Sequence, residues 1–93
     1  MRIISQDEII DTPYDEAVIY IYYRKNDVQI YVSNVGDDEG FPIGTYNNGE
    51  DAVYVMSLIR TAFTHEDEYF YMPKAEDVFA IRARMNGSEQ SDR

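Results

Sequence analysis

Cysteine is absent from this chain of 93 residues, and histidine occurs only once. The lack of cysteine excludes disulfides, a thiolate nucleophile and a cysteine-ligated zinc site. A lone histidine also leaves too few ligands for a transition-metal site. His65 precedes three carboxylates, which fits a general base or a metal ligand, and also fits an exposed cation at a helix end. We expect the exposed cation, and we predict no cofactor and no bound metal.

Long apolar segments are missing as well. The longest, residues 17–23, is too short to span a bilayer, and the first six residues lack the apolar core of a signal peptide. The sequence therefore predicts a cytoplasmic protein.

Recognisable catalytic motifs are lacking too. No glycine is followed by the Lys-Ser/Thr pair of a phosphate-binding loop, and no serine lies in a nucleophile elbow. The acidic segment Asp37, Asp38 and Glu39 offers oxygen ligands for Ca²⁺ or Mg²⁺, but without the spacing of an EF-hand. A hydrated acidic loop is the simpler interpretation. We predict that the chain is not an enzyme.

Basic residues are scarce. The sequence has 8 Lys and Arg against 18 Asp and Glu, which gives a net charge of −10. Binding to a phosphate backbone or to anionic lipids requires clustered cations, so we expect no direct contact with nucleic acid or membrane. The acidic balance favours a basic protein partner, with plain solubility as the alternative interpretation.

Aromatic and β-branched residues, by contrast, are concentrated in two segments, residues 17–25 and 28–35. Asn26-Asp27 between them suits a two-residue type I′ turn, which places Lys25 opposite Val28 and Tyr22 opposite Tyr31. Side chains alternate between the two faces of such a hairpin. The predicted core face contains Ile19, Ile21, Tyr23, Val28, Ile30 and Val32. The predicted outer face contains Val18, Tyr20, Tyr22, Arg24, Gln29, Tyr31 and Ser33.

A helix is predicted from residue 47 to near Thr64. Asn47 is a favourable N-cap, and Glu50 three residues later completes a capping box. The spacing of apolar residues predicts a buried stripe made of Ala52, Val55, Met56, Ile59, Ala62 and Phe63.

Shorter elements surround these two. We predict strands at residues 2–5, 41–46 and 69–72, and a turn or edge segment around Pro13. Residues 74–85 fit a short helix, which we favour, or a strand. The sum is a single α+β domain over residues 1–85, with an antiparallel sheet of about four to five strands covered on one face by one main helix. Residues 86–93 are expected to form a flexible polar tail.

Four stretches occur in a characteristic order: "MRIISQ", "DTPYDE", "GTYNNGEDAVYVMSLIRTAF" and "FYMPKAEDV". This arrangement, which extends to about Val78, resembles a group of small uncharacterised proteins from phages and mobile genetic elements of Gram-positive bacteria. The chain departs from the group at Asn47, where a hydroxyl cap is usual, and at Gly49 in the first helical turn. The group has no catalytic motif, so the resemblance implies a genomic setting and a host bacterial cell rather than an activity.

By analogy between classes, small acidic phage proteins are often inhibitors of host defence, including anti-CRISPR proteins. Tyrosine suits a binding surface, and carboxylates can imitate a phosphate backbone in a basic groove. We therefore predict inhibition of a basic host protein such as a CRISPR effector. The predicted partner-binding residues are Tyr20, Tyr22, Tyr31, Asp37, Asp38, Glu39, Glu66, Asp67 and Glu68.

Other interpretations of the tyrosines are local packing across the strands and a homodimer interface. The corresponding alternative function is a self-associating regulatory or structural accessory protein of a mobile element. A metal-dependent enzyme or small-ligand binder is the third hypothesis.

Overall fold

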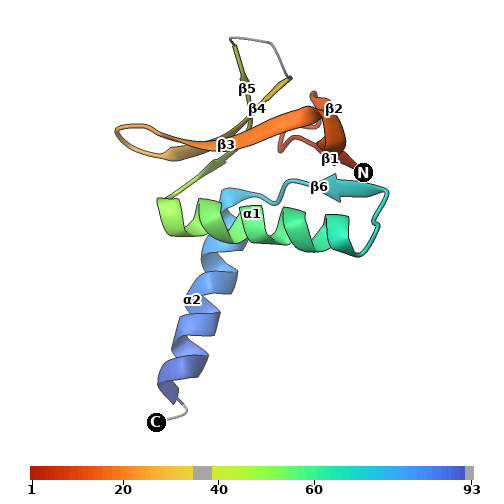
Figure 1. Cartoon of the computed structure of the whole chain (residues 1–93). Coiled ribbons are helices and arrows are strands. Elements are labelled where there is room, and N and C mark those ends of the chain that lie inside the picture. Colours follow the sequence, from red (N-terminus) through yellow and green to blue (C-terminus); the bar gives the residue numbers. More distant parts are fainter. Residues whose placement is uncertain (35–38, 92–93) are drawn as a thin grey trace.

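The computed structural model describes residues 1–34 and 39–91, with side chains as far as Met85. This part of the chain forms two three-stranded sheets and two helices, and the α+β class is thereby confirmed (Figure 1). None of the described helices is long and apolar enough to cross a membrane.

The larger sheet is antiparallel, with strand order β3-β4-β5. It consists of β3 (Ala17–Tyr23), β4 (Val28–Asn34) and β5 (Phe41–Tyr46), and these strands confirm the predicted hairpin and the strand that follows it. Helix α1 (Gly49–Thr64) packs across one face of this sheet and contacts all three strands (Figure 1). The opposite face has no covering layer in the described part of the chain.

The smaller sheet has the order β2-β1-β6. It contains β1 (Arg2–Ile4), β2 (Asp11–Pro13) and β6 (Tyr69–Tyr71), with β1 and β6 parallel. The prediction of a single antiparallel sheet was therefore wrong. The physical reason is Pro13, which has no N–H to donate, and the 3₁₀ turn η1 (Tyr14–Glu16) that follows, because together they separate β2 from β3.

Both sheets contribute to one hydrophobic core. Ile3 of β1, Ile30 of β4 and Ile59 of α1 are each almost fully buried. The buried cluster consists of Ile3, Val28, Ile30, Val32, Ile43, Tyr46, Ala52, Val55, Ile59, Met72 and Val78. In the predicted helical stripe, Met56 is only partly buried and Phe63 is exposed, because they lie at the margin of the helix–sheet contact.

Helix α1 begins one residue later than predicted. Asn48, not Asn47, is the N-cap, and its Oδ1 accepts a hydrogen bond of 2.8 Å from the Asp51 N–H. Glu50 therefore does not close a capping box. The predicted end at Thr64 is confirmed, and His65 follows it as an exposed C-cap residue.

Helix α2 (Ala75–Ser91) confirms the helical interpretation of residues 74–85, but its 17 residues make it longer than the short helix predicted. It continues through residues 86–91, for which the sequence predicts a polar tail. Figure 1 shows α2 leaving the body of the protein, with its first turns beside α1 and β5.

The register of the hairpin differs from the predicted one by two residues. Tyr20 lies opposite Tyr31, and Tyr23 lies opposite Val28. The turn residues are Lys25 and Asn26, because Arg24 and Asp27 close the hairpin with a backbone hydrogen bond of 2.9 Å and an ion pair of 2.7 Å. A shift by an even number leaves every side chain on its predicted face.

Candidate functional site

The candidate site begins with a cluster of aromatic side chains on the face of the sheet away from α1. Tyr20, Tyr22 and Tyr31 lie there, as the alternation predicts, and we call them the tyrosine patch. The Tyr31 ring lies 5.7 Å from that of Tyr20 and 5.4 Å from that of Tyr22, measured between centroids. Tyr22 is 51% exposed and Tyr20 38%. The rings therefore pack on one another while offering much of their surface to solvent.

Gly40 lies next to the tyrosine patch. A Cβ atom at this position would lie 2.5 Å from the Tyr20 hydroxyl and 3.0 Å from the Val32 carbonyl oxygen. Any larger residue would have to displace the Tyr20 hydroxyl and crowd the Val32 carbonyl, so glycine suits the close approach of the chain that enters β5. Sequence reasoning missed this role, because Gly40 and Tyr20 are 20 residues apart in the chain.

The exposure of Tyr23 differs from the prediction that it is a core residue. It lies on the α1 side of the sheet, as expected, but it is 66% exposed rather than part of the core. β3 is an edge strand, and Tyr23 stands at its end, beside the N-terminus of α1. A Cβ at Gly49 would lie 2.9 Å from the Tyr23 ring. The helix begins there and leaves the outer side of the ring uncovered.

The predicted acidic residues do not all gather around the tyrosine patch. Glu39 is exposed and adjoins Gly40, which places it beside the patch. Asp37 and Asp38 lie outside the described residues. Glu66, Asp67 and Glu68 are exposed, but they follow α1, on the other side of the larger sheet (Figure 1). The predicted single surface is therefore divided between two sides of the protein.

Backbone hydrogen bonds fix the acidic segment that follows α1. The Glu66 N–H donates to the Phe63 carbonyl over 3.0 Å, and the Asp67 N–H donates to that of Ala62 over 3.1 Å. Glu66 has a φ of 61°, the left-handed conformation that often ends a helix. The Glu68 carbonyl accepts a bond of 2.9 Å from the Arg2 N–H. These carboxylates are consequently held on a defined backbone.

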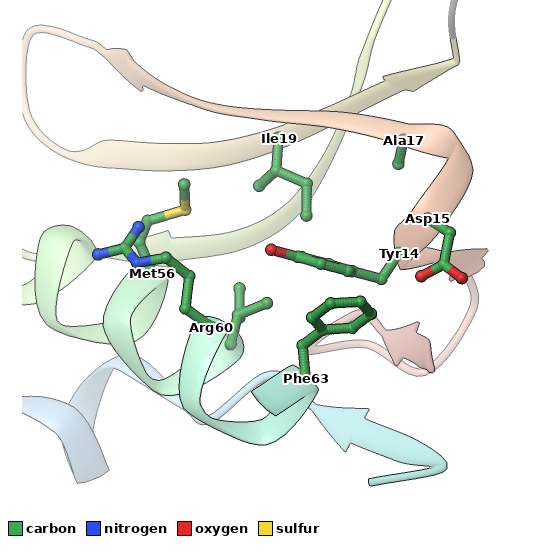
Figure 2. A pocket seen from close by; sticks show the side chains of 8 residues that line it. Tyr14, Asp15, Ala17, Ile19, Met56, Arg60 and Phe63 are labelled. Atoms are coloured by element: carbon green, nitrogen blue, oxygen red, sulfur yellow. The ribbon is translucent and has the colours of Figure 1, made fainter. Parts of the chain in front are cut away.

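A groove of about 460 Å³ lies between the first half of β3 and the second half of α1 (Figure 2). Its floor includes a contact between the rings of Tyr14 and Phe63, whose centroids are 4.7 Å apart. Sequence reasoning missed the groove, because Tyr14 belongs to a turn and its neighbour Phe63 is almost 50 residues away in the chain. The lining residues are Tyr14, Asp15, Ala17, Ile19, Met56, Ile59, Arg60 and Phe63.

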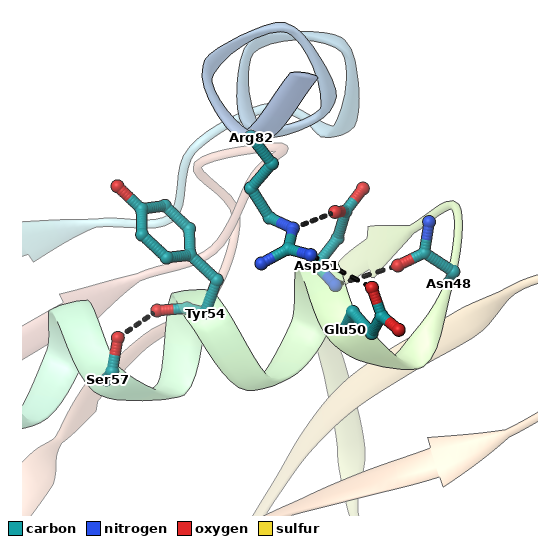
Figure 3. Close-up of polar contacts among 6 residues, drawn as sticks. All are labelled: Asn48, Glu50, Asp51, Tyr54, Ser57 and Arg82. Carbon is teal, nitrogen blue, oxygen red and sulfur yellow. Dashed lines mark hydrogen bonds and ion pairs between the residues drawn. The ribbon is translucent and has the colours of Figure 1, made fainter. Parts of the chain in front are cut away.

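A second, shallower hollow of about 880 Å³ lies near the start of α1 and includes Tyr23 and Val53. Arg82 of α2 reaches over it and forms ion pairs of 2.8 Å with Asp51 and 3.0 Å with Glu50 (Figure 3). The Asp51 side chain is only 4% exposed, so Arg82 provides the countercharge for a buried carboxylate.

Two titratable groups are shifted by their surroundings. Burial raises the pKa of the Tyr46 hydroxyl well above its ordinary value, against a smaller lowering by Gln6, and this hydroxyl donates a bond of 2.7 Å to the Pro73 carbonyl. Hydrogen bonds from the Ser5 hydroxyl and the Ile9 N–H lower the pKa of Asp7. Both groups have evident structural partners. Among the residues that the structure describes, no three acidic or histidine side chains converge as metal ligands would.

No protein-family model matches the chain, and no curated protein or solved structure shows significant similarity to it. The likeness to phage proteins, which rests on short motifs, therefore stays a prediction. The tyrosine patch, the groove and the distribution of charge are the features from which a function can be argued.

Proposed function

We propose that the chain is a non-enzymatic inhibitor that binds a basic, nucleic-acid-binding defence protein of a bacterial host, such as a CRISPR effector. The observation that carries the proposal is the tyrosine patch, which lies on a sheet face that no other element in the described part of the chain covers. Tyrosines combine large rigid rings with a hydroxyl that hydrogen-bonds, and they are enriched where proteins meet.

The position of the patch favours binding over packing alone. Two tyrosine rings that pack on a third would be better protected under a helix, as the opposite face of the same sheet is. Here the rings of Tyr20 and Tyr22 remain substantially exposed, with exposed Val18 as the neighbour of Tyr20 on the same face of β3. Burial of this surface by a partner would remove apolar area from water.

The charge distribution supports a basic partner. The described ion pairs engage Arg2, Arg24 and Arg82, whereas the chain has 18 acidic residues in all. The exposed carboxylates of Glu39 and of residues 66–68 create a negative field that steers a cationic partner into contact. A surface evolved to bind nucleic acid supplies the complementary lysine and arginine side chains.

A cleavage assay with purified CRISPR effectors tests the proposal. We expect the chain to inhibit an effector, and the double substitution Tyr20→Ala plus Tyr22→Ala to weaken inhibition at least tenfold, as loss of two interface aromatics does. The matched control is Tyr69→Ala plus Tyr71→Ala, which removes two tyrosines of similar exposure from β6. Absence of inhibition, or equal loss in both variants, would refute the role of the patch.

One observation supports the alternative role, a self-associating accessory protein of a mobile element. The edge strand β3 has an uncharged sequence from Ala17 to Tyr23, and such an edge is suited to pairing with another strand.

A further inference from the structure

The two edges of the larger sheet differ. At the β5 edge, Gln6 takes the place of a neighbouring strand. Its N–H donates to the Ile43 carbonyl over 2.8 Å, and its side-chain Oε1 accepts from the Thr45 N–H over 2.7 Å. Pro42 and a register irregularity between Ile30 and Tyr31 interrupt this edge further. β5 therefore has little capacity to pair with another chain.

The β3 edge has none of these protections. Its seven residues pair with β4 without a bulge, and they include no proline, glycine or charged residue. The Arg24 N–H donates to the Asp27 carbonyl of the facing strand. Because backbone direction alternates along a strand, Tyr22 and Tyr20 also direct their N–H and C=O groups to β4. Ile21 and Ile19 direct theirs away from β4, to the open edge. In the described part of the chain, no other segment hydrogen-bonds to the outward groups of Ile19 and Ile21.

We propose that β3 pairs antiparallel with β3 of a second copy, about a two-fold axis between the two Tyr20 residues. The sequence around β3, "DEAVIYIYYRK", is acidic at its start and basic at its end. In this register the turn that contains Asp15 and Glu16, just before β3, lies near Arg24 and Lys25, just after β3 of the second copy. This proximity occurs twice because the interface is isologous. The two copies therefore attract at this edge although each has a net charge of −10.

The backbone groups match in the same register. Ile19 lies opposite Ile21 of the second copy, and both residues direct their N–H and C=O groups outward, so they exchange hydrogen bonds. Val18 lies opposite Tyr22, a small side chain against a large one.

The same pairing places the Tyr23 ring at a groove of the second copy. Tyr23 comes to lie opposite Ala17 of the second copy, and both side chains are on the α1 side of the sheet. Ala17 borders the groove of about 460 Å³ between β3 and α1, which Met56 and Phe63 also line (Figure 2). The Tyr23 ring, 66% exposed in the single chain, enters the groove of its partner and becomes buried. This inference does not depend on the proposed inhibition, because pairing needs only the chain itself.

Sedimentation velocity over a wide range of concentration tests the pairing. We expect a dimer that dissociates on dilution, and a folded monomer for Tyr23→Ala. Tyr31→Ala is the control, because Tyr31 lies on β4, one strand away from the paired edge. A wild-type monomer at every concentration would overturn the proposal. So would a dimer that Tyr31→Ala dissociates and Tyr23→Ala does not, since it would use the face of the sheet.

Charge reversal tests the register. Asp15→Lys alone and Lys25→Asp alone place like charges together twice in each dimer, and each raises the dimer Kd about fivefold or more. An equimolar mixture of the two variants restores opposite charges at both contacts, so it should form a heterodimer of near wild-type affinity. Glu76→Lys, which changes the charge equally on α2, should leave the Kd unchanged. A mixture no tighter than either variant alone would overturn this register.

Discussion

At the scale of single residues, Tyr46 shows how one buried hydroxyl joins distant parts of the chain. It lies at the end of β5, is 1% exposed, and donates to the Pro73 carbonyl just before α2. Burial disfavours the phenolate, so the folded state retains the Tyr46 proton at pH values where the unfolded chain loses it. The stability that depends on this proton is fully present below the unfolded pKa of about 10 and decreases as the pH rises above it.

Tyr46→Phe is therefore expected to flatten the decline of stability at alkaline pH. Between about pH 10 and pH 11, the unfolding free energy of the wild type should fall by up to about 1.4 kcal/mol more than that of the variant. At neutral pH the variant should lose about 1 kcal/mol with the bond to Pro73. Urea denaturation at several pH values measures both effects.

The control is Tyr71→Phe, which removes a tyrosine that is 62% exposed. This variant should follow the wild-type pH dependence. If all three proteins lost stability in parallel above pH 10, Tyr46 would not be the group responsible.

At the scale of secondary-structure elements, the contact between α1 and α2 depends on Arg82. The guanidinium bridges Glu50 and Asp51, and the Asp51 carboxylate is almost inaccessible to solvent. In Figure 1 α2 projects from the body of the protein; Val78 in its first turns is buried in the core, and Arg82 forms the ion pairs one turn further along the helix.

Arg82→Met should destabilise the protein by about 1–3 kcal/mol, because it leaves the buried Asp51 carboxylate without its countercharge. Arg84→Met, at an exposed position of the same helix, is the matched control and should have little effect. In an Asp51→Asn background the cost of Arg82→Met should shrink, which a double-mutant cycle measured by thermal unfolding will show. Equal costs for Arg82→Met and Arg84→Met would contradict the bridge.

Elements with strong local patterns could be predicted from the sequence. Alternation identified the hairpin and the outward direction of Tyr20, Tyr22 and Tyr31, and helical periodicity identified α1. The hairpin register was missed because Asn26-Asp27 has the better local turn propensity, whereas the Arg24–Asp27 pair determines the turn in the fold. The parallel pairing of β1 with β6 joins residues about 67 positions apart, which no local pattern reveals.

The candidate site was only partly predictable for the same reason. Alternation predicts which side chains share a face of the sheet. How much of that face α1 covers depends on tertiary packing. Tyr23 was assigned to the core because the sequence does not show that α1 begins beside it. The separation of Glu39 from residues 66–68 likewise follows from the path of α1 beneath the sheet.

At the scale of the whole molecule, the excess of negative charge should govern how fast a partner is found. Association with a basic protein should slow as salt is added, because ions screen the attraction over about 10 Å at 0.1 M ionic strength. Neutralising Glu66, Asp67 and Glu68 together, by substitution to Gln, Asn and Gln, should slow association about threefold to tenfold and change dissociation little. Stopped-flow mixing with a purified basic partner protein measures both rates.

Neutralisation of Glu8, Glu76 and Asp77 removes the same charge from exposed positions elsewhere and serves as the control. A smaller effect is expected there. Association rates that did not respond to salt would contradict electrostatic steering by this protein.

The side chain of Gln6 finally limits how large an assembly can become. A sheet with two open edges adds copies at both ends and grows into a fibre without a defined size. Gln6 hinders pairing at the β5 edge, because it already bonds to the backbone there. In the described part of the chain, the larger sheet is then left with one open edge, β3. In the proposed pairing, two molecules use their β3 edges on each other, so no open β3 edge remains and the assembly stops at a dimer. Substitution of Gln6 would free the Thr45 N–H but would leave Pro42 and the register irregularity in place, so the β5 edge would remain a poor site for a further copy.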